Sequence, residues 1–223
     1  MSDSIPVLIV PTLNGHDRLQ DMLESVDYPI DQVIVVDNGG TDYQWVKPDW
    51  VDTLDVIRLP SNLGVAGSWN LGIKSSPFAD YWLIVNDDVT FAPGSLARFA
   101  LEGGTWLDAI SLCNDQSPWC AFTIGQEVVT VVGLFDEAYY PAYFEDDEYA
   151  RRAMEMMGVD IVYYTGIAVN HANSSTINSG FSEANHRTYL ANQALWQGKQ
   201  LSASRFDPIG WRLDIRRAND WGI

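Results

Sequence analysis

Cysteine, histidine and basic residues are all scarce in this chain. Its 223 residues include two cysteines, three histidines, and 13 lysine and arginine residues against 30 aspartate and glutamate residues. Two cysteines form neither a disulfide framework nor a metal-ligand set, so we expect Cys113 and Cys120 to be reduced core residues. The formal charge of −17 repels phosphate backbones and anionic lipid. We therefore expect no nucleic-acid partner, although one small anionic ligand could still be held through a bound metal.

Long apolar runs are also absent. The longest, Val7–Val10 and Val33–Val36, are far too short to cross a bilayer. The first residues, MSDSIPV, lack the basic start and the apolar stretch of a secretory signal peptide. The sequence therefore predicts a soluble, cytoplasmic protein without a membrane span.

Two common nucleotide-binding motifs are missing as well. The small-residue segment SNLGVAGSWNLG, residues 61–72, is not followed by the Gly-Lys-Ser/Thr of a P-loop. The first apolar run is not followed by G-x-G-x-x-G, the dinucleotide-binding fingerprint. These absences argue against a P-loop ATPase and against an NAD-dependent oxidoreductase.

Short apolar runs that alternate with amphipathic stretches indicate an α/β fold. The residues are 47% apolar, which is enough to bury a sizeable core. Continuously apolar strands favour a parallel sheet that is covered on both faces. The strands predicted in the first half are Val7–Val10, Gln32–Val36, Asp55–Leu59 and Tyr81–Asn86. The helices predicted there are a stretch around Leu19–Val26 with Asp17 as its cap, Val65–Lys74, and Pro93–Leu101 with proline in its first turn.

The second half of the chain is less regular. Its predicted strands are Ala109–Leu112, Trp119–Ile124, Val159–Tyr164 and Ala168–His171, and its predicted helices are Asp146–Met157 and Glu183–Gln197. A regular first half and a mixed second half fit a Rossmann-like, mostly parallel sheet with a smaller mixed lobe.

Polar residues follow three of the predicted strands, where open α/β sheets bind their ligands. They include Asn14 after the first strand, Asp37 after the second, and Asn86-Asp87-Asp88 after the fourth. Carboxylates at such an edge suit a hard divalent cation, which takes oxygen ligands. The alternative is that Asp88 caps the turn that leads to Pro93.

A second acidic cluster lies at the start of the helix predicted near residue 146. Acids there complement the helix dipole, and Asp147–Arg151 and Glu148–Arg152 have the spacing of weak ion pairs. The functional alternative is that one carboxylate is aimed into a cleft as a general base. His171 ends a predicted strand; in isolation, a single histidine is more often a structural residue than a metal ligand.

Taken in order, six segments resemble glycosyltransferase family 2, the inverting enzymes of the GT-A fold that use nucleotide-sugar donors. The resemblance covers about residues 6–197. The segments are VPTLN, VVDNGGTD, SNLGVAGSWNLGI, NDDV, VGLFDEAYYPAYFEDDEYARR and VNHANSST. It implies a single domain over residues 1–223, with a nucleotide-binding half (1–100), an acceptor-side half (101–200) and a C-terminal extension (201–223).

The resemblance also implies a role for particular residues. The nucleotide pocket is expected to be lined or framed by Pro11, Thr12, Asn14, Asp37, Asn62 and Asn70. Asn86 and Asp87 are expected at the ribose or phosphate, Asp88 and His171 at the metal, Asp146 as the general base, and Glu145 on the acceptor side. Asn86 stands where the family's motif begins with Asp, so the metal is assigned to Asp88. Glu148 stands where the family has a further Asp, so Glu148 is assigned no role.

The implied reaction transfers a sugar, with inversion, from a nucleoside diphosphate to an acceptor hydroxyl. The donor is expected to be a UDP- or dTDP-sugar and the cofactor Mn²⁺ or Mg²⁺. The acceptor is a carbohydrate, a glycoconjugate or a protein. Aromatic residues of the second half are either core residues or platforms for a sugar ring: Trp106, Trp119, Tyr139, Tyr140 and Tyr143.

Two other functions remain open from the sequence. A sugar-nucleotide nucleotidyltransferase shares the α/β layout and acidic metal sites, but it should carry a glycine-rich basic loop after the first strand. PTLNGHDRLQ has one glycine and one arginine. The other alternative is an inactive glycosyltransferase-like module that binds proteins, against which the joint presence of Asp37, Asp88, Asp146 and His171 argues.

Overall fold

The computed structural model describes residues 4–40, 42–172 and 182–201. Within these ranges one sheet has the strand order β3-β2-β1-β4-β7-β6-β8, and β5 pairs separately with β9. The strands are β1 (Ile5–Thr12), β2 (Ile30–Asp37), β3 (Val51–Arg58), β4 (Tyr81–Val85), β5 (Val89–Phe91), β6 (Ile110–Leu112), β7 (Ala121–Gly125), β8 (Val162–Tyr164) and β9 (Val169–His171). The helices are α1 (His16–Glu24), α2 (Gly64–Ser75), α3 (Ser95–Thr105), α4 (Gln126–Val132), α5 (Glu145–Met157) and α7 (Ser182–Leu201). Most of the expected C-terminal extension, from residue 202 on, lies outside the described residues.

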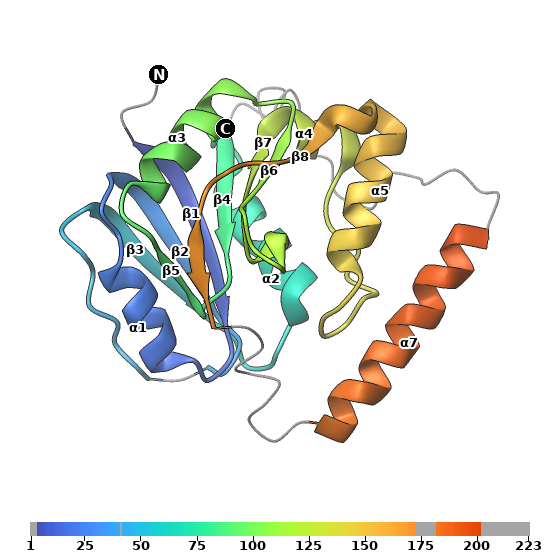
Figure 1. Cartoon of the computed structure of the whole chain (residues 1–223). Coiled ribbons are helices and arrows are strands. Elements are labelled where there is room, and N and C mark those ends of the chain that lie inside the picture. The colour runs from blue at the N-terminus through green and yellow to red at the C-terminus, as the bar shows by residue number, and fades with distance from the viewer. Residues whose placement is uncertain (1–3, 41, 173–181, 202–223) are drawn as a thin grey trace, which may run out of the picture.

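The first half is the parallel α/β arrangement that the sequence predicts. β3, β2, β1 and β4 are parallel neighbours, and helices cover both faces of the sheet (Figure 1). Alternate side chains of β1 enter opposite cores: Leu8 packs with the apolar residues of α1 and α3, and Ile9 with those of α2. Because β1 is buried on both faces, its residues Val7–Val10 form a continuous apolar run.

Two predicted helix starts are wrong by a few residues. α1 begins at His16 after Gly15, so Asp17 lies within the first turn and does not cap the helix. α3 begins at Ser95 after Gly94, so Pro93 precedes the helix. Gly94 has a φ of 79°, a left-handed conformation that glycine adopts without steric cost.

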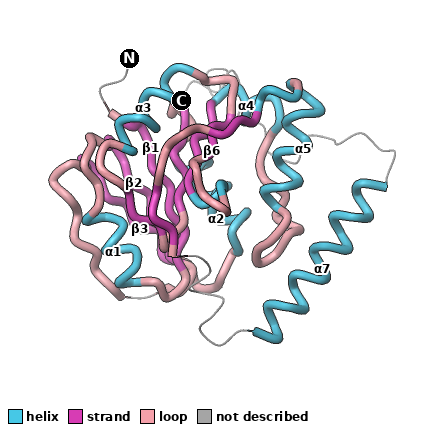
Figure 2. Tube along the Cα trace, in the orientation of Figure 1, coloured by secondary structure: helices cyan, strands magenta, loops and turns pink. Residues whose placement is uncertain are grey.

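The second half continues the same sheet with mixed strand directions (Figure 2). β7 runs antiparallel to both β4 and β6, and β6 is parallel to β8. Two predicted strands are shorter than expected, because Pro118–Cys120 and Val159–Ile161 form 3-10 turns. α4 was not predicted, since seven residues are too few to display a helical period.

The small sheet brings two distant segments together. β5 pairs antiparallel with β9, which places Val89 opposite His171. The backbone N–H of Ala172 donates to the carbonyl of Asp88 at 3.0 Å. His171 is thereby held beside the end of β4.

A buried ion pair fixes α5 to the end of α4. Arg152 contacts Glu148 through two hydrogen bonds of 3.0 and 2.9 Å, and both side chains are 0% exposed. The same guanidinium donates to the carbonyls of Val132 and Leu134. The weak ion pair predicted for Glu148 and Arg152 is present and lies in the core, which gives Glu148 a structural role.

The other predicted pair on α5 has a different partner. Arg151 contacts Glu155 at 2.9 Å, and its guanidinium lies over the ring of Trp196 in α7. Figure 1 shows α7 running beside α5, on the side away from the parallel strands. None of the helices among residues 4–40, 42–172 and 182–201 is both long and apolar enough to cross a membrane.

The two cysteines are buried free thiols, as the sequence predicts. Cys113 follows β6 and Cys120 precedes β7, and their sulfur atoms lie 3.6 Å apart.

Candidate active site

The carboxyl ends of β1, β2 and β4 gather polar side chains at one edge of the sheet. The register pairs Pro11 with Val36 and Thr12 with Asp37. The Thr12 hydroxyl donates to the carboxylate of Asp87, just beyond β4, at 2.7 Å. We call Thr12, Asn14, Asp37 and Asp87 the strand-end cluster.

Asp37 is buried and shapes the turn that follows β2. Its Oδ1 accepts hydrogen bonds from the backbone N–H groups of Gly39 and Gly40 at 3.0 and 3.2 Å. Gly40 has a φ of 59°, and a Cβ there would lie 2.5 Å from the carbonyl oxygen of Leu59. A Cβ on Gly39 would lie 2.7 Å from Oδ1 of Asn14, so the Asn14 side chain lies directly against this turn.

Asp87 joins the strand-end cluster to α1. Arg18 contacts its carboxylate at 3.4 Å, and a Cβ on Gly15 would lie 2.1 Å from the same Oδ2. Glycine at position 15 therefore lets the carboxylate approach the backbone. Burial raises the pKa of Asp87, although the Thr12 hydroxyl and the Arg18 guanidinium both favour its ionised form.

Asp88, His171 and Asp115 form a second group, which we call the His171 triad. Nε2 of His171 lies 3.2 Å from Oδ1 of Asp88, and Nδ1 lies 3.2 Å from Oδ1 of Asp115. The side chains of His171 and Asp88 are only 5% and 8% exposed. The two carboxylates, Asp88 first, raise the pKa of His171 against the opposing effect of burial.

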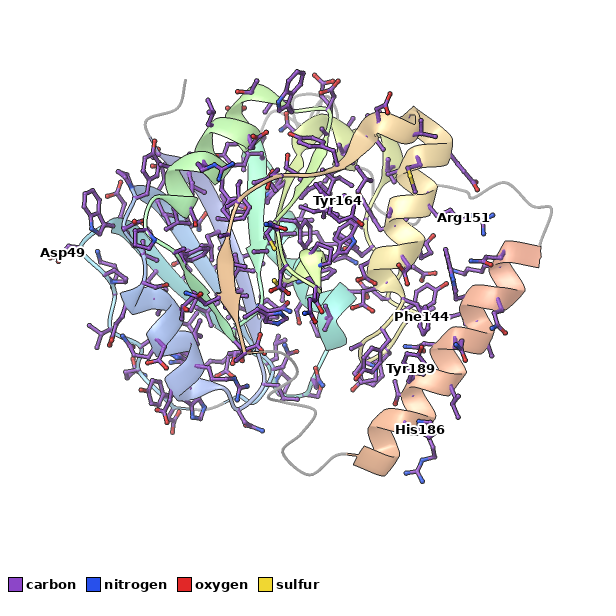
Figure 3. All side chains as sticks on the ribbon, viewed as in Figure 1. Asp49, Phe144, Arg151, Tyr164, His186 and Tyr189 are labelled. Carbon is purple, nitrogen blue, oxygen red and sulfur yellow. The ribbon has the colours of Figure 1, made fainter. Side chains whose placement is uncertain are left out.

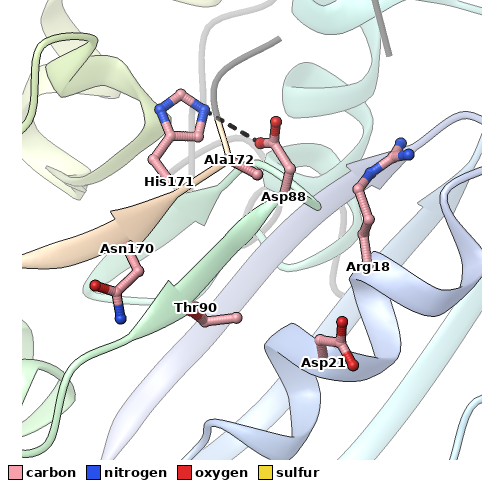
Figure 4. Close-up of a pocket in the computed structure, with 7 residues that line it drawn as sticks. All are labelled: Arg18, Asp21, Asp88, Thr90, Asn170, His171 and Ala172. Carbon is pink, nitrogen blue, oxygen red and sulfur yellow. Dashed lines mark ion pairs between the residues drawn. The ribbon is translucent and has the colours of Figure 1, made fainter. Parts of the chain in front are cut away.

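A cavity of about 250 Å³ adjoins the His171 triad. Figure 4 shows Asp88, His171 and Arg18 converging on it, with Thr90 and Asp21 on the lower wall. One guanidinium thus faces the same space as the Asp88–His171 pair. Asp37 and Asp146 do not line this cavity.

Glu145 and Asp146 open α5. Burial raises the pKa of Glu145 to about 8, with a further contribution from Asp146. Burial likewise raises the pKa of Asp146 to about 6, with a further contribution from Asp147. Asp146 accepts a hydrogen bond of 2.9 Å from the backbone N–H of Asp147. Burial thus favours the protonated form of both carboxyl groups, and of Glu145 more strongly than of Asp146.

The residues before Glu145 have an unusual backbone. Tyr143 and Phe144 have φ values of 82° and 70°, which non-glycine residues rarely adopt. Oε2 of Glu145 is buried and has no hydrogen-bond partner among the described residues. Strained backbone and unpaired buried polar atoms concentrate at functional sites.

Residues 134–144, the segment that leads to Glu145, are tied to α2. The amide of Asn70 donates to the carbonyl of Phe135 and to Glu137, and its oxygen accepts from the Phe135 N–H. The Val65 N–H donates to the carbonyl of Pro141 at 2.7 Å. The N-terminal end of α2 in turn contacts Asn38, whose oxygen accepts from Leu63 at 2.8 Å.

These contacts locate the remaining predicted residues. Asn70 is 1% exposed and its amide is committed to the 134–144 segment. Asn62 accepts a hydrogen bond from the Gly64 N–H at the start of α2. Asn86 is half-buried, and its backbone N–H donates to the carbonyl of Cys120.

The structure thus brings together Thr12, Asn14, Asp37 and Asp87, and separately Asp88 and His171. Asp146 comes from another element, whose N-terminal end points toward the same lower edge of the sheet in Figure 1. Of the predicted aromatic residues, Tyr139 belongs to the core at 0% exposure, whereas Trp106 and Tyr140 are each 52% exposed.

Sequence reasoning missed Arg18 and Asp115. Arg18 lies at the start of the first predicted helix, where the apolar periodicity that predicts the helix does not mark an arginine. Asp115 follows the short strand β6, and the same search for polar residues after strands would have found it there.

Residues 7–110 match the sequence model of Glycosyl transferase family 2. A galactofuranosyl glycosyltransferase of Leishmania donovani is 21% identical over 295 residues, which cover 96% of this chain and 66% of that protein. Residues 1–349 of S. aureus TarS, solved with UDP-GlcNAc, have a TM-score of 0.54 and 17% identity over 73% of this chain and 56% of that chain. The mannosyltransferase PcManGT from Pyrobaculum calidifontis, solved with GDP-Man and Mn²⁺, has a TM-score of 0.55 and 16% identity over 98% of this chain and 79% of that chain.

The chain therefore spans just under two thirds of the curated relative and little more than half of the TarS fragment. The structural likeness is one of fold, and the sequence match falls on the half that carries the strand-end cluster. The family match over residues 7–110 and the shared architecture agree: this half of the chain resembles glycosyltransferase family 2, and the fold is that of the solved glycosyltransferases.

Proposed function

We propose that this chain is a metal-dependent inverting glycosyltransferase that moves a sugar from a nucleoside diphosphate to an acceptor hydroxyl. The observation that carries the proposal is the His171 triad beside the strand-end cluster, at the edge where α/β sheets bind ligands. Structural neighbours of the same fold bind UDP-GlcNAc, and GDP-Man with Mn²⁺. These ligands support a nucleotide-sugar donor for this chain.

The strand-end cluster supplies the nucleotide pocket in this proposal. Asp37 is held by two backbone N–H groups, so its carboxylate is pre-oriented for hydrogen bonds from the base. Asn14 lies against the same turn, and Pro11 and Thr12 form the adjoining end of β1. Arg18 is a cation at the mouth of the cavity, where it can contact the diphosphate.

The residues present fit a divalent cation. Asp88 offers a carboxylate oxygen and His171 an imidazole nitrogen 3.2 Å away, so one ion can contact both, and Mn²⁺ accepts both ligand types. When bound, such a cation neutralises charge on the leaving diphosphate as a Lewis acid. Asp115 holds the other ring nitrogen, an arrangement that fixes the orientation of metal-binding histidines.

Asp146 is the general base of the proposed reaction. The acceptor oxygen forms a bond to the anomeric carbon, the bond from that carbon to the diphosphate oxygen breaks, and Asp146 takes the acceptor proton. A carboxylate whose pKa is about 6 is ionised at neutral pH and is a stronger base than an ordinary aspartate. Glu145, whose buried Oε2 has no hydrogen-bond partner within the described part of the chain, is assigned to hydrogen bonds with the acceptor.

The metal assignment predicts a specific pattern of nucleotide binding. With Mn²⁺ present, the matching nucleoside diphosphate at 100 times its Kd should stabilise the wild-type chain by about 2.7 kcal/mol. Asp88→Ala should lose the Mn²⁺-dependent part of this stabilisation. Asp115→Asn should weaken Mn²⁺ binding by about 10- to 100-fold, because His171 loses the carboxylate that orients it.

Thermal unfolding with UDP, dTDP and GDP, with and without Mn²⁺, makes this measurement, and calorimetry gives the Mn²⁺ affinity. Asp21→Asn is the matched control, since Asp21 is an acid on the wall of the same cavity but outside the His171 triad. Equal Mn²⁺ affinity in the wild-type, Asp88→Ala and Asp115→Asn proteins would remove both carboxylates from the metal site.

A further inference from the structure

The chain that leads into α5, and so to the proposed base, is held in place from two sides. On its inner side, α2 contacts the 134–144 segment through Asn70 and the Val65 N–H. On its outer side lies α7, which is separated from the rest of the described chain by residues 173–181 in the sequence. The outer contacts fall on the residues with unusual backbone, Tyr143 and Phe144.

Asn192 is the central residue of this outer contact. It is 5% exposed although it lies on a long surface helix. Its amide nitrogen donates to the carbonyl of Ala142 at 2.7 Å and to the carbonyl of Tyr143 at 3.3 Å. An amide group has two N–H donors, so one side chain satisfies two consecutive carbonyls of the turn.

Aromatic packing completes the contact. The Tyr189 ring, one helical turn before Asn192, lies 5.5 Å from the Tyr143 ring and 5.2 Å from the Phe144 ring. Figure 3 shows Phe144 and Tyr189 facing each other between α5 and α7. Further along α7, Lys199 contacts Asp136 and lies over the ring of Tyr139.

Backbone in a sparsely populated conformation persists only where surrounding contacts determine it. The φ values of Tyr143 and Phe144 set the direction in which the chain enters α5. Asp146 follows two residues later, so a change in this turn changes the position of its carboxylate.

We propose that Asn192 is a positioning residue, which holds the 142–144 turn with Tyr143 and Phe144 in the left-handed conformation and thereby places Asp146 against the acceptor hydroxyl. This inference rests on the proposed function, because it takes Asp146 as the base. It gives α7, which lies outside the family match at residues 7–110, a role in positioning the proposed base.

The test compares Asn192→Leu, which removes both hydrogen bonds without adding charge, with Asn192→Ser, which keeps one short donor. Asn192→Leu should lower kcat by about 10- to 100-fold, since displacing a catalytic group by about 1 Å has effects of this size. Donor affinity should stay within about twofold. Amide hydrogen exchange in residues 142–147 should become faster, and Asn192→Ser should fall between Asn192→Leu and the wild type in both kcat and exchange.

Gln197→Leu is the control, because it makes the same amide-to-leucine change at an exposed position of α7. It should leave kcat and exchange in residues 142–147 unchanged. Unchanged exchange in both Asn192 variants would show that Asn192 does not hold the turn. Faster exchange with wild-type kcat would show that the turn does not position the base.

The failure of this inference can be told apart from that of the proposed function. If Asp146→Asn retains wild-type turnover, the proposed function fails whatever the exchange data show. If Asp146→Asn loses turnover and the Asn192 variants do not, only the role of Asn192 is overturned. Should Asn192→Leu fail to fold, the kcat and exchange of Asn192→Ser still decide the question.

Discussion

Asp146→Asn is expected to lower turnover by about 10²- to 10⁴-fold, the usual contribution of a general base, while donor binding stays unchanged. Asparagine preserves the size of the side chain and a hydrogen-bond acceptor, but it cannot take the acceptor proton. The wild-type rate should rise with pH through about 6, where the buried carboxyl group loses its proton. Asp146→Asn should lack this rise.

The measurement is release of nucleoside diphosphate from the donor that the wild type binds, with a panel of sugar acceptors and with water. Asp147→Asn provides the matched control, because it makes the same substitution one residue further along α5 at an exposed position. It should keep turnover near the wild-type value at pH 7. Near-normal turnover in Asp146→Asn would remove Asp146 from the mechanism.

Asp146→Asn should also be more stable than the wild type at high pH. A folded-state pKa raised from 3.8 to about 6 means that the folded chain binds more protons than the unfolded chain between these pH values. The stability of the wild type therefore falls as pH rises through this window, and the penalty is fully present above it. Thermal unfolding at pH 8 should favour Asp146→Asn, and below pH 4 the difference should vanish.

The second large effect concerns folding rather than chemistry. Glu148→Gln is expected to destabilise the chain by about 3–5 kcal/mol, because it leaves the buried Arg152 guanidinium without its counter-charge. Two carbonyls, of Val132 and Leu134, still accept hydrogen bonds from Arg152 but carry no net charge. Urea unfolding followed by tryptophan fluorescence measures the loss.

Glu155→Gln is the control for this prediction. Glu155 forms the same i,i+4 contact with Arg151 on the same helix at 2.9 Å, but its side chain is 47% exposed. Exposed pairs contribute less than about 1 kcal/mol, so this variant should unfold near the wild-type urea concentration. Equal effects of the two substitutions would show that burial does not distinguish the pairs.

The parallel half of the fold could be predicted because three of its strands, β1, β2 and β4, are buried on both faces. The resulting apolar runs, such as Val33–Val36, stand out from polar turns, and every strand predicted there is present. The exact element ends could not be predicted in the same way, because they depend on backbone conformation. Gly94, for example, adopts a positive φ and moves the start of α3 beyond Pro93.

The candidate site likewise has some residues that the sequence pattern predicts and others that depend on tertiary structure. Asp37 ends β2 and Asp87 lies two residues beyond β4, so their position at one edge is a consequence of topology that the sequence pattern already contains. The partner of His171 depends on the pairing of β5 with β9, two three-residue strands about 80 residues apart. Asn192 acts through tertiary contacts alone, and no local pattern marks it.

Asn70 and Glu148 show the limit of reasoning from motifs. Asn70 was expected to frame the nucleotide pocket, and the structure shows that its amide also holds Phe135 and Glu137. Glu148 was expected to form a weak ion pair with Arg152, and that pair is fully buried. Both side chains stabilise the part of the chain that lies between α2 and α5. Their burial could not be predicted, because the spacing of residues in the sequence does not reveal it.

The most direct test of the proposed sugar transfer is identification of the products made with Mn²⁺ present. Purified chain is incubated with UDP-, dTDP- and GDP-sugars and simple sugar acceptors, and separately with nucleoside triphosphates and sugar phosphates. The account predicts release of a nucleoside diphosphate with formation of a glycoside of inverted anomeric configuration, and loss of both products in Asp88→Ala. Pyrophosphate release from a triphosphate and a sugar phosphate would contradict it in favour of a nucleotidyltransferase, and no product from any mixture would favour an inactive binding module.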